Sequence, residues 1–107
     1  MKVLLDENLP HELRPLLMPT HDVFTVSHLG WSAFENGALL AQAAANGFDV
    51  LVNMDQGIEY EQNLANLPLA VAILQVKTNK IDDLRPLVSQ LLSALATLKP
   101  RSLARVP

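Results

Sequence analysis

Short apolar runs that alternate with helical patterns constrain the fold of this chain more than any other feature of its sequence. Four such runs have the length and apolar content of buried strands: Lys2–Leu5, His21–Val26, Asp49–Asn53 and Leu69–Val76. Strands that alternate with helices form a parallel sheet with right-handed crossovers and helices on both faces. We therefore predict an α/β fold, a three-layer α/β/α sandwich around a mainly parallel sheet of four or five strands.

Helical spacing of apolar residues fills the first intervals between these runs. A first helix is expected after Asn8, which is suited to cap it, although Pro15 requires a kink or a later start. A second helix is predicted over residues 35–46, and Gly47 is suited to end it. Each crossover between neighbouring strands is thus long enough to contain a helix.

The last helix has the clearest apolar face of the chain. It is expected to open at Asn79 or Asp82, with Pro86 in its first turn. Its apolar residues recur at helical spacing: Leu84, Leu87, Val88, Leu91, Leu92, Leu95 and Leu98. Arg101–Val106 follows as a candidate edge strand. The sequence contains no repeat, low-complexity tract or linker, so residues 1–107 are expected to form one domain.

Composition excludes several classes of protein. The chain is 50% apolar and contains no cysteine. An apolar content this high excludes an intrinsically disordered chain, and the lack of cysteine excludes disulfide frameworks, thiolate metal sites and cysteine nucleophiles. The longest apolar run, Leu69–Leu74, is much shorter than a membrane span, and the N-terminal residues do not have the pattern of a signal peptide. We expect a soluble, cytoplasmic protein.

Charge is distributed unevenly along the sequence, although the net charge is only −3. Residues 1–76 contain nine acidic side chains and two basic ones, whereas residues 77–107 contain six basic side chains and two acidic ones. The N-terminal part is therefore suited to gather carboxylates, and the C-terminal part is suited to meet an anion. A solvated, charged tail explains the same asymmetry without any partner.

Acidic and amide side chains follow two of the predicted strands. Asp6 and Glu7 come directly after the first strand, and Asn53 and Asp55 lie at and after the end of the third. In open α/β sheets, binding sites lie outside the carboxyl ends of the strands, where the strand order reverses. If the first and third strands are neighbours, these side chains converge at that edge.

Two further polar residues are expected on the same side. Glu35 and Asn36 stand at the start of the helix that follows the second strand. Clustered oxygen ligands suit a hard divalent cation such as Mg²⁺ or Mn²⁺, which supports hydrolysis of a phosphodiester. Ordinary turn and cap chemistry explains an Asp or Asn after a strand equally well. The three histidines are not at metal-ligand spacing, and the sequence has no glycine-rich phosphate loop and no nucleophile or zinc-protease motif.

At these positions the chain resembles the short PIN-like proteins, a toxin-type family within the PIN nuclease superfamily. The resemblance covers most of the sequence. It is carried by Met1–Asn8 with Leu9-Pro10, His21–Val23, Leu29–Ser32, Leu39-Leu40, Val50–Val52 with Asp55, and Leu84–Leu87. It implies a compact three-layer α/β/α fold with an acidic metal site. It also implies a toxin of a toxin–antitoxin pair that acts on RNA, with a helix-turn-helix antitoxin as the partner.

Matched residue by residue, the resemblance is uneven. Asp6, with Glu7 and Asn8 after it, matches the opening Asp-Glu-Asn of the family, and Asp55 matches the aspartate after the third strand. The family often has aspartate where Asn36 stands. It often has threonine in place of Asn53, and many members have aspartate and phenylalanine in place of Gly57 and Ile58. Glu35 or Glu61 is a candidate to replace the missing charge.

Three functional hypotheses follow. In the first, the protein is a ribonuclease in which Asp6 and Asp55 bind Mg²⁺ or Mn²⁺, Glu7 or Glu35 orients water, and the basic C-terminal third attracts RNA. Asn8, Asn36 and Asn53 then line the site.

The second hypothesis is a PIN-like protein without catalytic activity, which acts by binding a partner or as a homodimer. Asn36, Gly57 and a mean hydropathy of +0.20 motivate it. The third is a receiver-like phosphoacceptor domain with Asp55 as the acceptor. Against it, Asp55 lies two residues beyond the predicted strand end, and Lys77 follows the fourth strand although such a domain has its lysine after the fifth.

Overall fold

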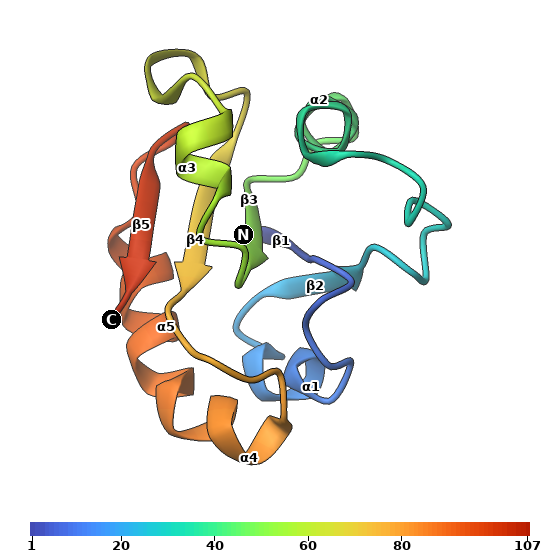
Figure 1. The fold of residues 1–107 in the computed structure, drawn as a ribbon. Coiled ribbons are helices and arrows are strands. Elements are labelled where there is room, and N and C mark those ends of the chain that lie inside the picture. Colours follow the sequence, from blue (N-terminus) through green and yellow to red (C-terminus); the bar gives the residue numbers. More distant parts are fainter.

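A five-stranded, entirely parallel sheet forms the centre of the computed structural model, which describes residues 1–107 (Figure 1). The strand order is β2-β1-β3-β4-β5. The bounds are β1 Lys2–Leu5, β2 Asp22–Thr25, β3 Val50–Asn53, β4 Ala70–Leu74 and β5 Leu103–Val106. The four predicted strands and the predicted edge strand are therefore confirmed, each within two residues at either end.

The strand order reverses between β1 and β3. The chain adds β2 on one side of β1 and then crosses to the other side to add β3, β4 and β5 in succession. The residue pairs Val3–Val50, Leu4–Leu51 and Leu5–Val52 set the register between the two central strands. The carboxyl ends of β1 and β3 therefore lie side by side, which is where the sequence places Asp6 and Asp55.

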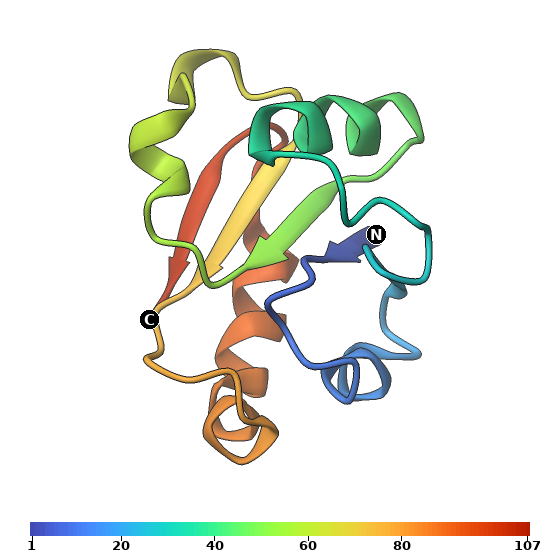
Figure 2. The same ribbon diagram turned by 45° about the vertical axis from the view of Figure 1, so that its right-hand side comes forward.

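Helices cover both faces of the sheet, so the three-layer α/β/α arrangement is confirmed (Figures 1 and 2). On one face, α1 (Leu13–Leu17), α4 (Ile81–Leu84) and α5 (Val88–Thr97) bury their leucines against alternate residues of the strands. On the other face, α2 (Asn36–Ala45) and α3 (Ile58–Glu61) cover the remaining strand residues. Two short 3₁₀ turns, η1 (Leu64–Asn66) and η2 (Arg85–Leu87), complete the chain.

The helix boundaries differ from the prediction at two places. The first helix begins only at Leu13, where Glu12 precedes it without a capping hydrogen bond, so Asn8 is not a cap. The last helix is preceded by Lys80 rather than capped by Asn79 or Asp82, and it is interrupted by η2 at Pro86. Proline supplies no backbone N–H and fixes its own φ, which favours a break of this kind. No helix is both long and apolar enough to cross a membrane.

Candidate functional site

Asp6 and Asn53 lie next to each other at the point where the strand order reverses. Leu5 pairs with Val52, and the Asp6 N–H donates to the Val52 carbonyl at 3.0 Å, so the next positions along the two strands are adjacent. Leu4 and Leu51 belong to the apolar cluster beneath α2 and α3. Because side chains alternate along a strand, Asp6 and Asn53 turn to that same face.

The Asp6 carboxyl is largely shielded from solvent, with 8% of the residue exposed. Its Oδ1 accepts a hydrogen bond from the Glu7 N–H at 2.8 Å. Burial raises the pKa of Asp6 above the ordinary value of 3.8, and the negative charges of Glu7 and Asp55 raise it further, against the lowering effect of that hydrogen bond. The two aspartates predicted from the sequence are thus close enough to repel each other.

Asp55 lies in the loop between β3 and α3, where two donors fix its carboxylate. The Gly57 N–H donates to Oδ1 at 2.9 Å, and the Asn36 side-chain amide donates to Oδ2 at 3.1 Å. The same Asn36 amide also donates to Glu61 Oε2 at 3.3 Å. Asn36 therefore links the start of α2 to the carboxylates of Asp55 and Glu61.

Gly57 leaves little room beside the Asp55 carboxylate. A Cβ at this position would lie 3.2 Å from Asp55 Oδ1 and 3.6 Å from Glu61 Oε1. The backbone φ of Gly57 is −71°, which any residue adopts, so the close approach is the only constraint here. A side chain at this position would crowd the Asp55 carboxylate and make an ordinary contact with Glu61.

Two amides at this edge have buried polar atoms without a hydrogen-bond partner. Asn53 is 0% exposed, and neither its Oδ1 nor its Nδ2 is bonded to another protein atom. The Oδ1 of Asn8 is also buried and unpartnered. Buried polar atoms are nearly always paired, because an unpaired one loses about 1–3 kcal/mol. The buried Asn53 and Asn8 oxygens are therefore polar atoms that no other protein atom satisfies.

Of the two glutamates that were expected to assist catalysis, Glu7 lies beside Asp6, whereas Glu35 makes no contact with either aspartate through a hydrogen bond. Glu7 is exposed at the rim beside Asp6. Glu35 is exposed ahead of α2 and makes no hydrogen bond to either aspartate. It lines an open pocket of about 520 Å³ together with Asn36, Gly37, Glu61 and Gln62. Of the two candidates to replace the missing charge, Glu61 is the one tied to Asp55 through Asn36.

The basic residues of the C-terminal third do not form one surface. Arg105 pairs with Glu59 of α3 across the edge of the sheet. Lys99 and Arg101 line a pocket with Met1 and Asp49, which precede β1 and β3, so they lie at the opposite end of the strands from Asp6. Lys77 and Lys80 are exposed in the loop after β4, on the side of the acidic residues. Arg105 lies level with Asn53 through Ile73, but its guanidinium is paired with Glu59.

The raised pKa of Asp6 predicts how the stability of the metal-free protein depends on pH. The folded state binds the Asp6 proton more tightly than the unfolded chain does. Below the unfolded pKa of about 3.8 the carboxyl is protonated in both states, so it does not lower the free energy of unfolding there. As pH rises through the higher folded pKa, the free energy of unfolding falls. Urea denaturation of the parent and Asp6→Asn in chelator measures this. The difference between the two should grow from acid to neutral pH, and a constant difference contradicts the prediction.

The residues at this edge suit a divalent cation of the Mg²⁺ type, although no three carboxylate or imidazole side chains converge there. The donors available are the carboxylates of Asp6 and Asp55 and the unpartnered Asn53 oxygen. Mg²⁺ is usually bound in proteins through one or two carboxylates together with waters and substrate phosphates, and Asp6 and Asp55 supply the carboxylates. No protein-family model, curated protein or solved structure matches the sequence.

Proposed function

We propose that this protein is a metal-dependent, PIN-like endoribonuclease that uses Mg²⁺ or Mn²⁺. One observation carries the proposal: a buried Asp6 carboxyl, repelled by Asp55, stands beside the unpartnered Asn53 amide where the strand order reverses. Without a cation this arrangement destabilises the fold, because the Asp6 charge is desolvated and the Asn53 amide lacks partners. Groups kept in such an arrangement are typical of functional sites.

The residues of the chain have separate roles in this proposal. Asp6, Asp55 and the Asn53 oxygen hold the cation, and Asn36 keeps Asp55 in place through the hydrogen bond at 3.1 Å. The chemistry that a bound Mg²⁺ or Mn²⁺ supplies is activation of water and neutralisation of the charge that develops on a phosphodiester. Glu7, exposed at the rim beside Asp6, orients the attacking water.

The biological role follows from the resemblance to toxin-type PIN-like proteins. In this role the substrate is RNA, the protein acts in the cytoplasm, and a helix-turn-helix antitoxin binds it. Lys77 and Lys80, which are exposed in the loop after β4 on the side of the acidic site, attract the RNA backbone.

Calorimetric titration with Mn²⁺, followed by an RNA cleavage assay, tests the ribonuclease proposal. The parent should bind one Mn²⁺ and cleave RNA, and Asp55→Asn should lose both properties while remaining folded. Asp22→Asn is the matched control, because it removes an exposed carboxylate at the amino end of β2. No binding at millimolar Mn²⁺ means that the site is not catalytic, and favours a protein that acts by binding a partner or its own copy.

The strand order also suits a phosphoacceptor domain with Asp55 as the acceptor. Both Asp55 oxygens already accept hydrogen bonds, from Gly57 and Asn36, and Asp55 lies two residues beyond the end of β3. These features favour a fixed ligand over an acceptor that changes its charge and size. Labelling of Asp55 by a small phosphodonor with Mg²⁺ would favour the phosphoacceptor function instead.

Asn36→Asp should lower the stability of the metal-free protein and strengthen metal binding. The substitution removes the amide donor to Asp55 and Glu61 and adds a third negative charge between them. We expect a loss of about 1–2 kcal/mol in the free energy of unfolding without metal. An added carboxylate should raise the affinity for Mn²⁺ by about tenfold. Denaturation and calorimetry measure the two effects.

Asn36→Ala is the control for this prediction, because it removes the donor without adding a charge. It should lose stability without any gain in Mn²⁺ affinity. Equal affinities of Asn36→Asp and Asn36→Ala for Mn²⁺ would place the cation away from Asp55, or nowhere in the protein.

A further inference from the structure

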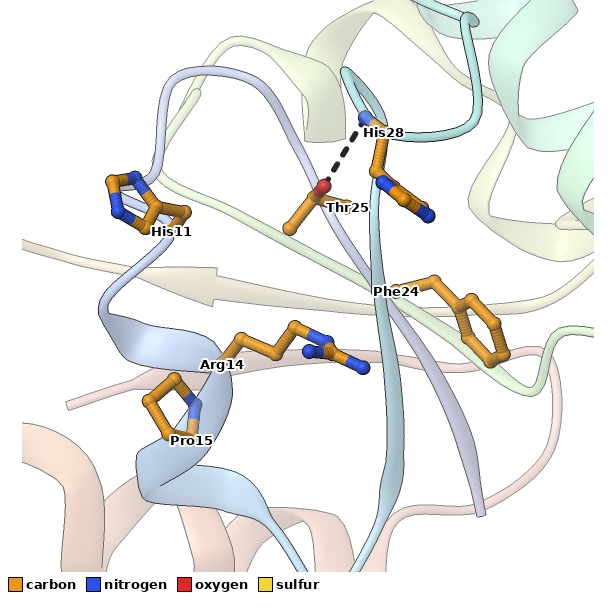
Figure 3. A pocket seen from close by; sticks show the side chains of 6 residues that line it. All are labelled: His11, Arg14, Pro15, Phe24, Thr25 and His28. Atoms are coloured by element: carbon orange, nitrogen blue, oxygen red, sulfur yellow. Dashed lines mark hydrogen bonds between the residues drawn. The ribbon is translucent and has the colours of Figure 1, made fainter.

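A basic pocket lies at the carboxyl end of β2, one strand away from Asp6. It has a volume of about 530 Å³ (Figure 3). Its lining consists of His11, Arg14, Pro15, Phe24, Thr25 and His28. Thr25 is the last residue of β2 and pairs with Leu5, which directly precedes Asp6. The pocket and the acidic site therefore open at the same end of the sheet, on neighbouring strands about 5 Å apart.

Arg14 is held in this pocket with most of its donors free. Its Nε donates to the Val23 carbonyl of β2 at 2.7 Å, which fixes the guanidinium against the edge strand. No carboxylate pairs with Arg14, and its remaining N–H groups have no protein partner. Figure 3 shows the side chain extending from α1 into the space that Phe24, Thr25 and His28 border. A guanidinium fixed through one nitrogen presents the others to an anion.

The charge around Arg14 is unusual for this part of the chain. Residues 1–76 contain only one other basic side chain, Lys2, whose Nζ donates to the Asn46 carbonyl at 2.7 Å and lies over the Phe48 ring. No carboxylate lines the pocket, although Glu12 contacts the exposed His11 at 3.1 Å. The pocket is thus a local basic site inside a strongly acidic segment.

We propose that this pocket binds a phosphate group of the RNA strand that enters the acidic site. Arg14 supplies the fixed charge, and the exposed imidazoles of His11 and His28 supply further donors. The assignment of the phosphate to RNA rests on the proposed ribonuclease function, whereas phosphate binding itself does not. A strand that crosses the carboxyl ends of β3 and β1 continues over β2, which brings its next phosphates to Arg14.

Amide NMR spectra of the full-length protein in chelator test this proposal without any cleavage. Inorganic phosphate and a short oligouridylate should shift the same resonances around Thr25 and His28, and uridine alone should not. Arg14→Gln should lower the affinity of the protein for the oligonucleotide by about tenfold or more. It should also reduce the slope of log affinity against log salt by about 0.7, the value for one phosphate contact on a single strand.

Three control variants make the outcomes distinct. Arg85→Gln removes an exposed arginine of η2 and should leave binding unchanged. His28→Gln, in an exposed turn, should weaken oligonucleotide binding several-fold. It replaces Arg14→Gln as the test if that variant does not fold. Asp6→Asn should keep phosphate binding while losing cleavage, which separates a failure of the ribonuclease proposal from a failure of this one. Equal shifts in the parent and Arg14→Gln overturn the proposal. So does a protein that binds inorganic phosphate but does not bind the oligonucleotide.

Discussion

Asp6→Asn should make the metal-free protein more stable and, at the same time, remove Mn²⁺ binding and RNA cleavage. The variant removes a charge that burial and the neighbouring carboxylates disfavour, and the asparagine Oδ1 still accepts the hydrogen bond from the Glu7 N–H. We expect a gain of about 1 kcal/mol in the free energy of unfolding at neutral pH. Cleavage should fall at least about a hundredfold, because a direct ligand contributes more than the groups that support it.

Denaturation with and without Mn²⁺ measures the stability of the metal-free protein and the stabilisation that Mn²⁺ binding adds. The parent should gain stability as Mn²⁺ is added, by about 2.7 kcal/mol at a hundred times its dissociation constant, and Asp6→Asn should gain none. Asp22→Asn removes the same charge from an exposed position and should change neither quantity. Parent-like cleavage by folded Asp6→Asn contradicts the proposed function.

The sequence predicts the central strands β1, β3 and β4 well because each is a short apolar run that is buried on both faces. All five residues of β4 and all four residues of β3 are buried, for example, whereas the edge strands β2 and β5 are only partly buried. The meeting of Asp6 with Asp55 is also predictable, because a general rule of parallel sheets places both at the carboxyl edge. Topology and binary pattern are sufficient for these features.

Other features of the site depend on contacts between short, polar segments. Glu61 approaches Asp55 because α3 is a single turn of four residues, and no hydrophobic period marks its position. The absence of partners for Asn53 is invisible in the sequence, since asparagine at a strand end is normally satisfied by a turn. Such details are set by loop geometry, which propensity does not determine.

The basic pocket shows the same limit for residues that are far apart in the chain. His11, Arg14 and His28 come from a turn, a helix and a loop, and their spacing follows no motif. The sequence spacing of the histidines predicts no metal site made of imidazoles alone. It does not predict that α1 folds back along β2 and brings His11 and His28 to the same pocket as Arg14.

Substitution of Asn53 by a residue of similar size should give the largest change in stability at this site. Asn53→Leu fills the same space with apolar atoms beside Leu51 and Ile73 and removes two buried, unpartnered polar atoms. We expect a gain of about 2 kcal/mol in the free energy of unfolding without metal, or roughly 8 °C in Tm. Mn²⁺ affinity should fall by about tenfold, because one oxygen donor is lost.

Asn53→Asp tests the same site with the opposite sign. It places a carboxylate of identical shape next to Asp6, so the metal-free protein should lose about 2 kcal/mol. With Mn²⁺ present, the added ligand should restore this stability and bind the cation more tightly than the parent does. If Asn53→Leu is less stable than the parent, the Asn53 amide is satisfied within the fold. A buried polar group that stabilises the protein in this way has no need of a cation, and the case for a metal site would then rest on Asp6 and Asp55 alone.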